Sequence, residues 1–380
     1  MKIIDVTSIL VSSKYGNGNV FGQPKGVKSI SLIQITTDYK DYYGIGETYA
    51  GVYSPELIPN VIKFLKANII GKKVNDSGII DTLLNIPFIS NNGLIKSVIS
   101  GVEIALFDLL GKIHKKPIFK LLNPKKINFK KINCYASGGS IIFKPSDISR
   151  ELDNLLNEGF KSYKMRAGYY RIKKDQERIK TASKLLGNNN LIVDAIMGTR
   201  SKKWSLKEAV KFSKKIDKFN ILWLEEPLNP NNLKDMSQLT VKSNVPIAFG
   251  ESFTSDSEFE NAILLNSCNY IQPDITHCGY KTATKMVDIA RKKNMKIAMH
   301  VWGSPIALLA NFHFAIAKNV DFIEIPSVFL EFMSKKKEEL IEVKNGKLLF
   351  KTDKIYGLGL DLKNINFNKF KFVKNSGFKI

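Results

Sequence analysis

Cysteine, arginine and long apolar runs are all scarce in this sequence of 380 residues. Its three cysteines, Cys134, Cys268 and Cys278, are odd in number and too few for a disulfide framework, so we expect reduced, structural thiols. No run approaches the roughly 20 apolar residues that span a bilayer, and the opening of the chain alternates like a strand, without the apolar core of a signal peptide. These absences exclude a disulfide-rich secreted domain and a membrane-spanning protein, and they predict a cytoplasmic protein with no membrane partner.

The composition is that of a folded protein. Hydrophobic residues make up 44% of the chain and charged residues 24%, which allows a large buried core and excludes intrinsic disorder as the main state. At roughly 150 residues per domain, the length predicts two domains or one barrel with additions.

Positive charge is in large excess, but arginine contributes little of it. The 58 Lys and Arg residues against 35 Asp and Glu give a formal net charge of +23, as in many nucleic-acid-binding proteins. Arginine, which contacts to bases favour, occurs at only six positions, whereas lysine is scattered through the whole chain. Scattered lysines usually form a solvated surface. We therefore expect no nucleic-acid partner, and a non-catalytic nucleic-acid or anion-binding protein stays the third interpretation.

Short β-rich runs alternate with helical patterns from residue 132 onward. The runs begin 24 to 30 residues apart, which is the length of one strand, one helix and two short loops. The segments between them, such as 146–160, 205–219 and 280–294, have apolar residues at helical spacing. Eight parallel strands with intervening helices close into a barrel whose active site lies at the carboxyl ends of the strands. The runs are 132–137, 162–168, 191–197, 221–227, 245–252, 269–276, 296–302 and 321–326.

Residues 1–125 have a different order, with strand patterns first and helices afterwards. This order predicts a separate α+β domain. The barrel is predicted over 126–338. The segment 339–380 returns to strand and turn character, and we expect it to pack back onto the N-terminal domain because it is too short to form a domain alone. The N-terminal strand patterns are 3–12, 29–37 and 42–50, and the helical patterns are 55–70 and 94–114.

Charged or imidazole side chains occur near the carboxyl ends of seven of the eight runs. They are Lys164, Arg166, Asp194, Glu225, Glu251, Asp274, His300 and Glu324. Any one of them alone is explained as an ordinary polar residue in a loop after a strand. Seven successive strands with such a residue at the same height are not explained in this way, because a ring of buried carboxylates requires a cation or paired bases.

Three consecutive strands each contribute one carboxylate, namely Asp194, Glu225 and Glu251. Carboxylate oxygens are hard ligands of the kind that Mg²⁺ takes, and no Cys/His cluster with zinc spacing competes with them. Glu226 differs, because neighbouring residues of a strand point to opposite faces. The sequence therefore predicts that the first three bind one Mg²⁺ ion per subunit and that Glu226 supports the site.

Several motifs together resemble those of the enolase superfamily, in its mandelate racemase and muconate lactonizing enzyme branch. The resemblance covers nearly the whole chain and implies an α/β fold: a modified TIM barrel, (β/α)7β, with an N-terminal α+β capping domain that the C-terminal tail completes. It also implies substrate-specificity loops near 15–26 and 50–54. The motifs are KMR at 164–166, VDA at 193–195, WLEEP at 223–227, FGES at 249–252, QPD at 272–274 and HVWG at 300–303, with GIGETYAG at 44–51, SGVEIALFDLLGK at 100–112 and YGLGLDL at 356–362.

The resemblance also implies catalytic roles. Removal of a proton α to a carboxylate produces an enediolate, whose charge a divalent cation and Lys164 offset where it develops. His300 takes or returns a proton near neutral pH. Asp274 orients the imidazole and fixes its tautomer. Glu324 matches the position that hydrogen-bonds the substrate carboxylate as the enediolate forms.

Arg166 departs from the pattern of the racemases, which place a second lysine there. Arginine is a poor proton acceptor and is better suited to clamping a carboxylate or hydroxyl. This favours a Mg²⁺-dependent dehydratase of an acid sugar, with loss of water from the carbon next to the enediolate. The alternative is a racemase or epimerase of a 2-hydroxy or amino acid through the same enediolate. Both interpretations predict a small-molecule carboxylate substrate and a homo-oligomer.

Overall fold

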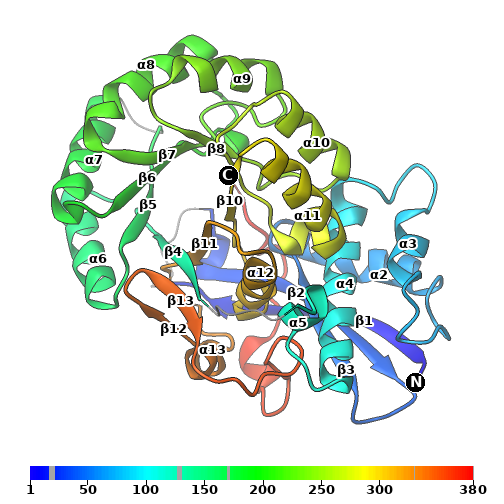
Figure 1. Cartoon of the computed structure of the whole chain (residues 1–380). Coiled ribbons are helices and arrows are strands. Elements are labelled where there is room, and N and C mark those ends of the chain that lie inside the picture. Colours follow the sequence, from blue (N-terminus) through cyan, green and yellow to red (C-terminus); the bar gives the residue numbers. More distant parts are fainter. Residues whose placement is uncertain (17–21, 126–130, 169–171, 329, 380) are drawn as a thin grey trace.

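The computed structural model describes residues 1–380 except 17–21, 126–130, 169–171, 329 and 380. Its described strands form an antiparallel sheet of three strands and a larger sheet that closes into a barrel. Figure 1 shows the smaller sheet and its helices beside the barrel, whose helices form an outer ring.

The smaller sheet consists of β1 (Ile3–Lys14), β2 (Val27–Thr37) and β3 (Tyr43–Thr48), and we call it the capping sheet. Two glycines of β3 allow a long helix to approach it closely. A β-carbon on Gly44 would lie 1.9 Å from Ala105 O, and one on Gly46 would lie 2.1 Å from Gly101 O. The helices of this part are α1 (Ala50–Tyr53), α2 (Ile58–Lys66), α3 (Ile79–Leu84), α4 (Gly93–Ile113) and α5 (Ile118–Leu122).

The larger sheet contains the eight parallel strands expected from the repeated pattern. The last of them pairs with the first, parallel to it, from Ile323 with Cys134 to Pro326 with Ser137, and this closes the barrel. The predicted α/β barrel with an N-terminal antiparallel sheet is therefore confirmed. The strands are β4 (Lys131–Ser137), β5 (Ser162–Arg166), β6 (Asn190–Asp194), β7 (Ile221–Glu225), β8 (Ile247–Phe249), β9 (Tyr270–Ile271), β10 (Lys296–Met299) and β11 (Phe322–Pro326).

One α-helix connects each barrel strand to the next, which is the (β/α)7β arrangement. Local sequence fixes where two of them begin. Ser205 and Ser255 each accept a hydrogen bond from the backbone of a glutamate three residues later, and that glutamate bonds back to the serine amide. The helices are α6 (Pro145–Asn157), α7 (Ile172–Leu186), α8 (Leu206–Ile216), α9 (Leu233–Lys242), α10 (Asp256–Leu264), α11 (Ile275–Lys292) and α12 (Pro305–Lys318).

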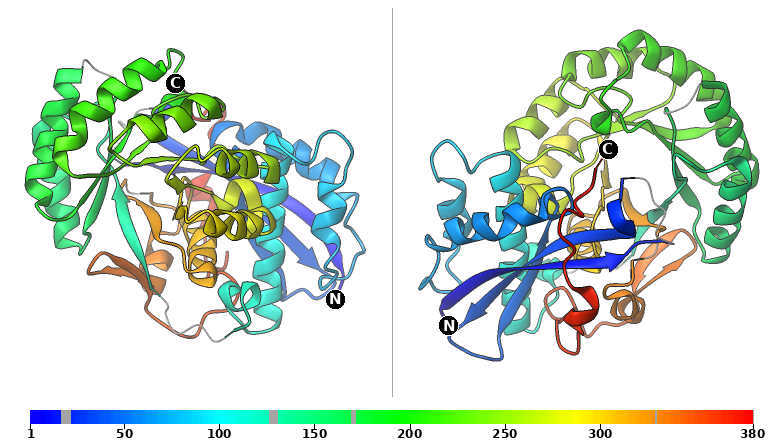
Figure 2. Two further views of the ribbon diagram at one scale, coloured as in Figure 1. Left: turned by 45° about the horizontal axis from the view of Figure 1, so that its top comes forward. Right: turned by 180° about the vertical axis from the view of Figure 1, so that it is seen from behind.

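After β11 the chain forms α13 (Ser334–Leu340) and a hairpin of β12 (Ile341–Lys344) and β13 (Lys347–Phe350). β13 pairs antiparallel with β4, so the hairpin extends the barrel sheet. The last residues then cross the capping sheet, as Figure 2 shows: Lys371 bridges to Val11, and Phe378 N donates to Val52 O at 2.9 Å. The domain boundaries at 125/126 and 338/339 stay predictions.

Asp108 of α4 joins the capping sheet to the C-terminal segment. Its buried carboxylate accepts from Ile45 N at 2.9 Å, from Leu358 N at 2.8 Å and from Lys112 Nζ at 2.5 Å. We expect Asp108→Asn to lower the free energy of unfolding by about 3 kcal/mol, because a buried charge loses its partner and one donor loses its acceptor. Chemical denaturation measures this.

The matched control is Asp5→Asn. Asp5 pairs with Lys66 at 2.7 Å, but its side chain is 42% exposed. Exposed pairs contribute little, so the free energy of unfolding should change by less than about 0.5 kcal/mol. Equal losses in the two variants would show that Asp108 does not join these segments.

Candidate active site

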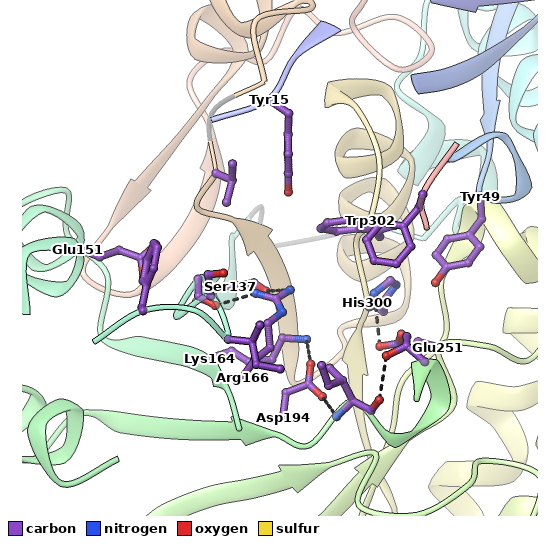
Figure 3. A pocket seen from close by; sticks show the side chains of 18 of the residues that line it. Tyr15, Tyr49, Ser137, Glu151, Lys164, Arg166, Asp194, Glu251, His300 and Trp302 are labelled. Atoms are coloured by element: carbon purple, nitrogen blue, oxygen red, sulfur yellow. Dashed lines mark hydrogen bonds and ion pairs between the residues drawn. The ribbon is translucent and has the colours of Figure 1, made fainter. Parts of the chain in front are cut away.

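A pocket lies where the carboxyl ends of the barrel strands meet the capping sheet (Figure 3). Tyr15 at the end of β1 and Tyr49 and Tyr53 around α1 line it from the capping side. The predicted site residues that line it are Lys164, Arg166, Asp194, Glu251 and His300. The other three, Glu225, Asp274 and Glu324, contact members of this set. The tertiary structure therefore brings all eight together.

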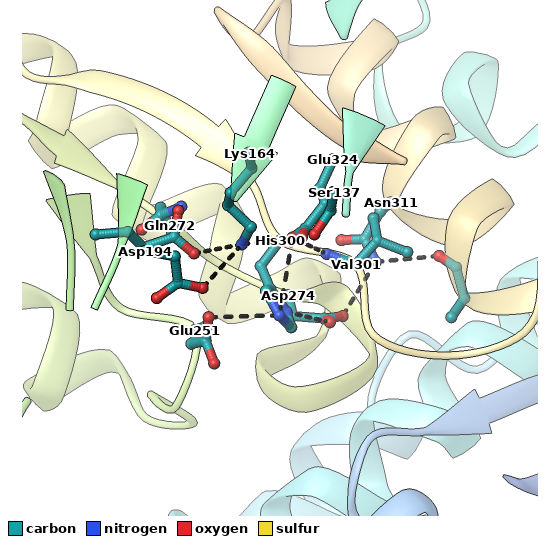
Figure 4. Close-up of polar contacts among 12 residues, drawn as sticks. Ser137, Lys164, Asp194, Glu251, Gln272, Asp274, His300, Val301, Asn311 and Glu324 are labelled. Carbon is teal, nitrogen blue, oxygen red and sulfur yellow. Dashed lines mark hydrogen bonds and ion pairs between the residues drawn. The ribbon is translucent and has the colours of Figure 1, made fainter. Parts of the chain in front are cut away.

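Lys164 lies at the centre of this polar cluster (Figure 4). Its Nζ is 2.5 Å from Glu225 Oε1, 2.9 Å from Glu324 Oε1 and 3.5 Å from Asp194 Oδ2. Burial opposes the charged ammonium, but the carboxylates of Glu225 and Glu324 outweigh it and raise the pKa of Lys164 well above its usual value. Lys164 is therefore a fixed positive charge in this arrangement and not a free base.

The carboxylates of this cluster repel one another. Burial and the nearby charge of Glu225 raise the pKa of Asp194 to about 7. Burial also raises the pKa of Glu251, in spite of His300 nearby. Two donors hold the inner oxygen of Glu225 in place: Trp223 Nε1 donates to Oε2 at 3.0 Å, and Gln272 Nε2 donates to it at 2.8 Å. The raised pKa values of Asp194 and Glu251 show that the cations of the site leave part of this negative charge uncompensated.

Glu226 lies beside the loop that follows β6. A β-carbon on Gly198 would lie 2.4 Å from Glu226 Oε2, and Glu226 Oε1 is buried with no hydrogen-bond partner among the described residues. Burial and then the charge of Glu251 raise the pKa of Glu226 well above its usual value. Glu225 thus lies among hydrogen-bond donors and Glu226 lies against Gly198, although both belong to the same cluster of negative charges.

His300 and Asp274 form a buried pair at the ends of β10 and β9. The distance from His300 Nδ1 to Asp274 Oδ2 is 2.9 Å, and Asp274 Oδ1 accepts from Asn311 Nδ2 at 3.0 Å. Burial opposes protonation, but Glu251, Glu324 and the Asp274 hydrogen bond raise the pKa of His300 to about 9. Asp274 keeps a lowered pKa despite its burial, because His300 and Asn311 donate to it. The pair therefore fixes the imidazole with Nε2 directed away from Asp274.

Glu324 lies between the two basic groups. His300 Nε2 is 3.8 Å from Glu324 Oε2, which also accepts from Val301 N at 3.1 Å. Burial works against ionisation, but Lys164 and His300 lower the pKa of Glu324 to about 2. This carboxylate is therefore anionic and held in place at the floor of the site.

Arg166 points from the end of β5 into the pocket beside the loop after β4. Its Nη1 donates to Gly138 O at 2.6 Å and its Nη2 donates to Ser137 Oγ at 3.4 Å. Burial opposes its charge, but Asp194 and Glu324 raise the pKa of Arg166 above its already high value. It is a permanent cation that lines the pocket, and not a proton acceptor.

Aromatic side chains form the wall opposite the carboxylates, and the polar pattern of the sequence gave no signal for their grouping. The rings of Tyr49 and His300 have centroids 5.8 Å apart, and Tyr49 Oη and Tyr53 Oη are 3.1 Å apart. Trp302 and Phe378 complete this wall. Of the two predicted specificity loops, 50–54 contributes Tyr53 and 15–26 contributes Tyr15; residues 17–21 lie outside the described part.

The other histidines do not take part in the cluster. His277 lies near it, but its Nδ1 is 2.9 Å from Ser97 Oγ and burial lowers its pKa to about 4, so it is neutral. His313 is buried in α12, where burial lowers its pKa to about 4 as well. His114 follows the C-terminal end of α4. This leaves His300 as the titratable imidazole of the pocket.

The donor set fits a divalent cation. Asp194, Glu225 and Glu251 offer only hard oxygen ligands, the pKa values of Asp194 and Glu251 are raised, and Glu226 Oε1 is a further buried oxygen without a partner. In the part of the chain that the structure describes, no three of these groups surround one point as metal ligands do, since Lys164 Nζ lies between Asp194 and Glu225. A divalent cation would offset the negative charge that Lys164, Arg166 and His300 leave uncompensated.

Comparison with known proteins decides the family. The sequence model of the family described as "Enolase C-terminal domain-like" matches residues 147–365, which is more than half of the chain. The chain belongs to the enolase superfamily. The resemblance stated from the motifs is thereby confirmed, and this enolase-superfamily enzyme carries the charged residues of its barrel at the strand ends where the family places its active site.

Two relatives of the chain have the names of acid-sugar dehydratases. The chain is 27% identical to L-talarate/galactarate dehydratase from Salmonella typhimurium over 90% of this chain and 83% of the relative. It is also 27% identical to arabinonate dehydratase from Saccharolobus solfataricus, over 87% of each chain. The crystal structure of the Salmonella dehydratase with Mg and L-lyxarohydroxamate matches the fold with a TM-score of 0.82 at 24% identity, over 97% of this chain and 93% of that chain.

None of the described helices combines the length and the apolar character that a membrane crossing requires. The predicted cytoplasmic location and homo-oligomeric state stay predictions.

Proposed function

We propose that this protein is a Mg²⁺-dependent dehydratase of an acid sugar, producing a 2-keto-3-deoxy acid. The observation that carries the proposal is the His300–Asp274 pair beside Glu324, which also contacts Lys164. The neighbouring carboxylates offer a metal ion oxygen ligands only. The two dehydratases at 27% identity support the choice of substrate class.

The residues of this chain would divide the reaction between them. Lys164 and Arg166 bind and orient the substrate carboxylate as fixed cations. His300, whose pKa of about 9 lies below that of Lys164, takes the proton from the carbon α to the carboxylate in its neutral form, and the electron pair of that C–H bond forms the enediolate. His300 then returns the proton to the β-hydroxyl, whose C–O bond breaks to release water. The resulting enol tautomerises to the keto acid. Asp274 holds the imidazole in its tautomer throughout.

Asp194, Glu225 and Glu251 would hold one Mg²⁺ ion per subunit. When bound, the ion acts as a Lewis acid that stabilises the negative charge developing on the substrate carboxylate. Glu324, anionic in the free site, would take up a proton from solvent when the substrate carboxylate binds beside it, and would donate a hydrogen bond to that carboxylate as it gains charge.

The alternative is a racemase or epimerase acting through the same enediolate. It requires a second proton carrier opposite His300, and Lys164 and Arg166 are the candidates. The three carboxylates within 3.5 Å of Lys164 Nζ keep it protonated, and Arg166 is a poorer base still. These contacts favour dehydration.

A substrate screen in D₂O tests the proposal. We expect the Mg²⁺-loaded protein to convert at least one member of a panel of acid sugars, including arabinonate, gluconate, galactonate, galactarate and talarate, into a semicarbazide-reactive keto acid. A racemase or epimerase would instead incorporate deuterium at C2 without loss of water. If no member of the panel undergoes either reaction, the proposal is contradicted. Salt-sensitive binding of DNA or RNA would then favour the nucleic-acid interpretation.

A further inference from the structure

Two neighbouring polar groups, one on the pocket wall and one packed against that wall residue, have no hydrogen-bond partner among the described residues. Trp302 lines the pocket two residues beyond His300, and its buried Nε1–H meets no acceptor. Lys28 of β2 is fully buried, and its Nζ lies 3.5 Å from the centre of the Trp302 ring without a hydrogen bond. A buried donor without an acceptor costs its desolvation free energy. At a pocket wall, such a donor points to a ligand that supplies the acceptor.

The contacts of the indole fix its orientation. The rings of Tyr15 and Phe378 meet it edge to face, with centroids 5.9 Å and 6.2 Å away. Burial lowers the pKa of Lys28 to about 7, against the opposing charge of Glu47. In its protonated form, the Lys28 ammonium over the ring face attracts the electron density of the ring and so makes the indole N–H a stronger donor. The ring is therefore held before any substrate binds, with a polarised N–H.

Glu47 of β3 fixes the loop that carries Trp302. Its Oε1 accepts from Ser304 N at 3.0 Å, and its Oε2 accepts from the Ser304 hydroxyl. A β-carbon on Gly303 would lie 2.5 Å from Glu47 Oε1, so glycine is required for this approach. Ser304 in turn caps α12 through Ile306 N at 3.1 Å. Asp274 thus holds the start of the loop at His300, and Glu47 holds its end.

The position of Trp302 indicates which part of a substrate it meets. Asp194 and Glu251 lie at one end of the pocket, Tyr15 lies at the other, and Trp302 lies beyond His300 on the side of Tyr15 (Figure 3). A substrate whose carboxylate is held near Asp194 and Lys164, with its reacting carbons at His300, extends its remaining carbons toward Trp302.

We propose that Trp302 is a substrate-binding residue whose Nε1–H donates to a hydroxyl of the acid sugar beyond the carbon that loses water. Lys28 and Glu47 are positioning residues that hold the indole and its loop from the capping sheet. This inference rests on the proposed function, since it names the part of the substrate that one wall of the same pocket recognises.

Steady-state kinetics with deoxy analogues tests the hydrogen bond. The probes are the acid sugar of the panel with the fastest turnover and its analogues, each lacking one of the hydroxyls that the sugar carries beyond C3. Trp302→Phe keeps the ring and removes the donor, so its KM for the parent acid should rise about tenfold with kcat nearly unchanged. For one of the deoxy analogues, the wild type and Trp302→Phe should have the same KM.

The matched control is Trp204→Phe, which removes an indole that packs on Phe212 outside the pocket. Its KM values should equal those of the wild type. A wild type that turns over no acid sugar would overturn the proposed function and this inference with it. A wild type with turnover, together with a Trp302→Phe variant whose KM is unchanged or rises equally for every analogue, would overturn the inference alone.

Variants of Lys28 test the positioning role. Lys28→Met removes the amine from a side chain of similar length. It should lower the preference for the parent acid, measured as the ratio of the KM of the same deoxy analogue to the KM of the parent acid. In the Trp302→Phe background, Lys28→Met should lower this ratio no further. Lys28→Arg keeps a cation on the ring and should restore the preference. Lys28 is only structural if Lys28→Met lowers Tm but leaves the ratio of the two KM values unchanged. The same conclusion follows if the losses of preference in Lys28→Met and Trp302→Phe add in the double variant.

Discussion

We expect His300→Asn to lower kcat by about 10²- to 10⁴-fold, the contribution of a positioned general acid or base. The imidazole contacts Asp274 through Nδ1 at 2.9 Å and is directed through Nε2 toward the pocket, where the same nitrogen lies 3.4 Å from Glu251. An asparagine side chain fills part of the same space but cannot carry the proton. Formation of keto acid from the acid sugar measures the loss, and Mg²⁺ affinity should change little.

Two further variants test whether the loss in His300→Asn comes from proton transfer. Asp274→Asn should be milder, since it removes the group that orients the imidazole and leaves the imidazole itself. His277→Asn is the matched control, because His277 is a buried imidazole beside the same pocket whose Nδ1 contacts Ser97. Its kcat should stay within about threefold of the wild type, as expected for a residue outside the chemistry. Equal losses in His300→Asn and His277→Asn would mean that the imidazole acts through packing and not through proton transfer.

Removal of divalent metal should abolish turnover, and Mg²⁺ should restore it. Glu251→Gln should weaken Mg²⁺ binding by at least about 10²-fold, because an amide oxygen carries no net charge to offset a divalent cation. Calorimetric titration with Mg²⁺ measures this loss independently of turnover. Lys164 occupies the space between Asp194 and Glu225 in the arrangement described above, so the titration also reports whether the cluster admits the ion.

Glu226→Gln is the matched control for the metal site. Glu226 is as buried as Glu225 and next to it in sequence, but its carboxylate lies against Gly198. Glu226→Gln should weaken Mg²⁺ binding by no more than about 10- to 100-fold, the scale expected for a residue that supports ligands without binding the ion, and by less than Glu251→Gln does. Equal losses in Glu251→Gln and Glu226→Gln would reassign the ligands, and full activity without metal would contradict the mechanism.

Much of the barrel and of its polar cluster could be predicted because both depend on local patterns. Asp194 and Glu225 each end a strand, and the parallel pairing of β6 with β7 places them directly opposite each other. A strand's residue order therefore fixes which charges reach the mouth of a barrel. The start of α11 could not be predicted from periodicity. The helical pattern begins at 280, but Asp274 caps the helix and Gly279, with φ of 79°, interrupts it, so that it starts at Ile275.

The sequence by itself determined the family, the barrel and the identity of the eight side chains at the strand ends, because residue type and spacing along one strand or helix are sufficient for these. Only the tertiary structure decided how the charges are paired. Lys164 is held by carboxylates of three other strands, and Glu47 binds Ser304 across 257 residues of sequence. Trp302 likewise lies under Lys28, a residue of the capping sheet. The pKa of a buried group and the orientation of an unpaired donor depend on neighbours that the fold brings from distant segments, and no local pattern encodes those neighbours.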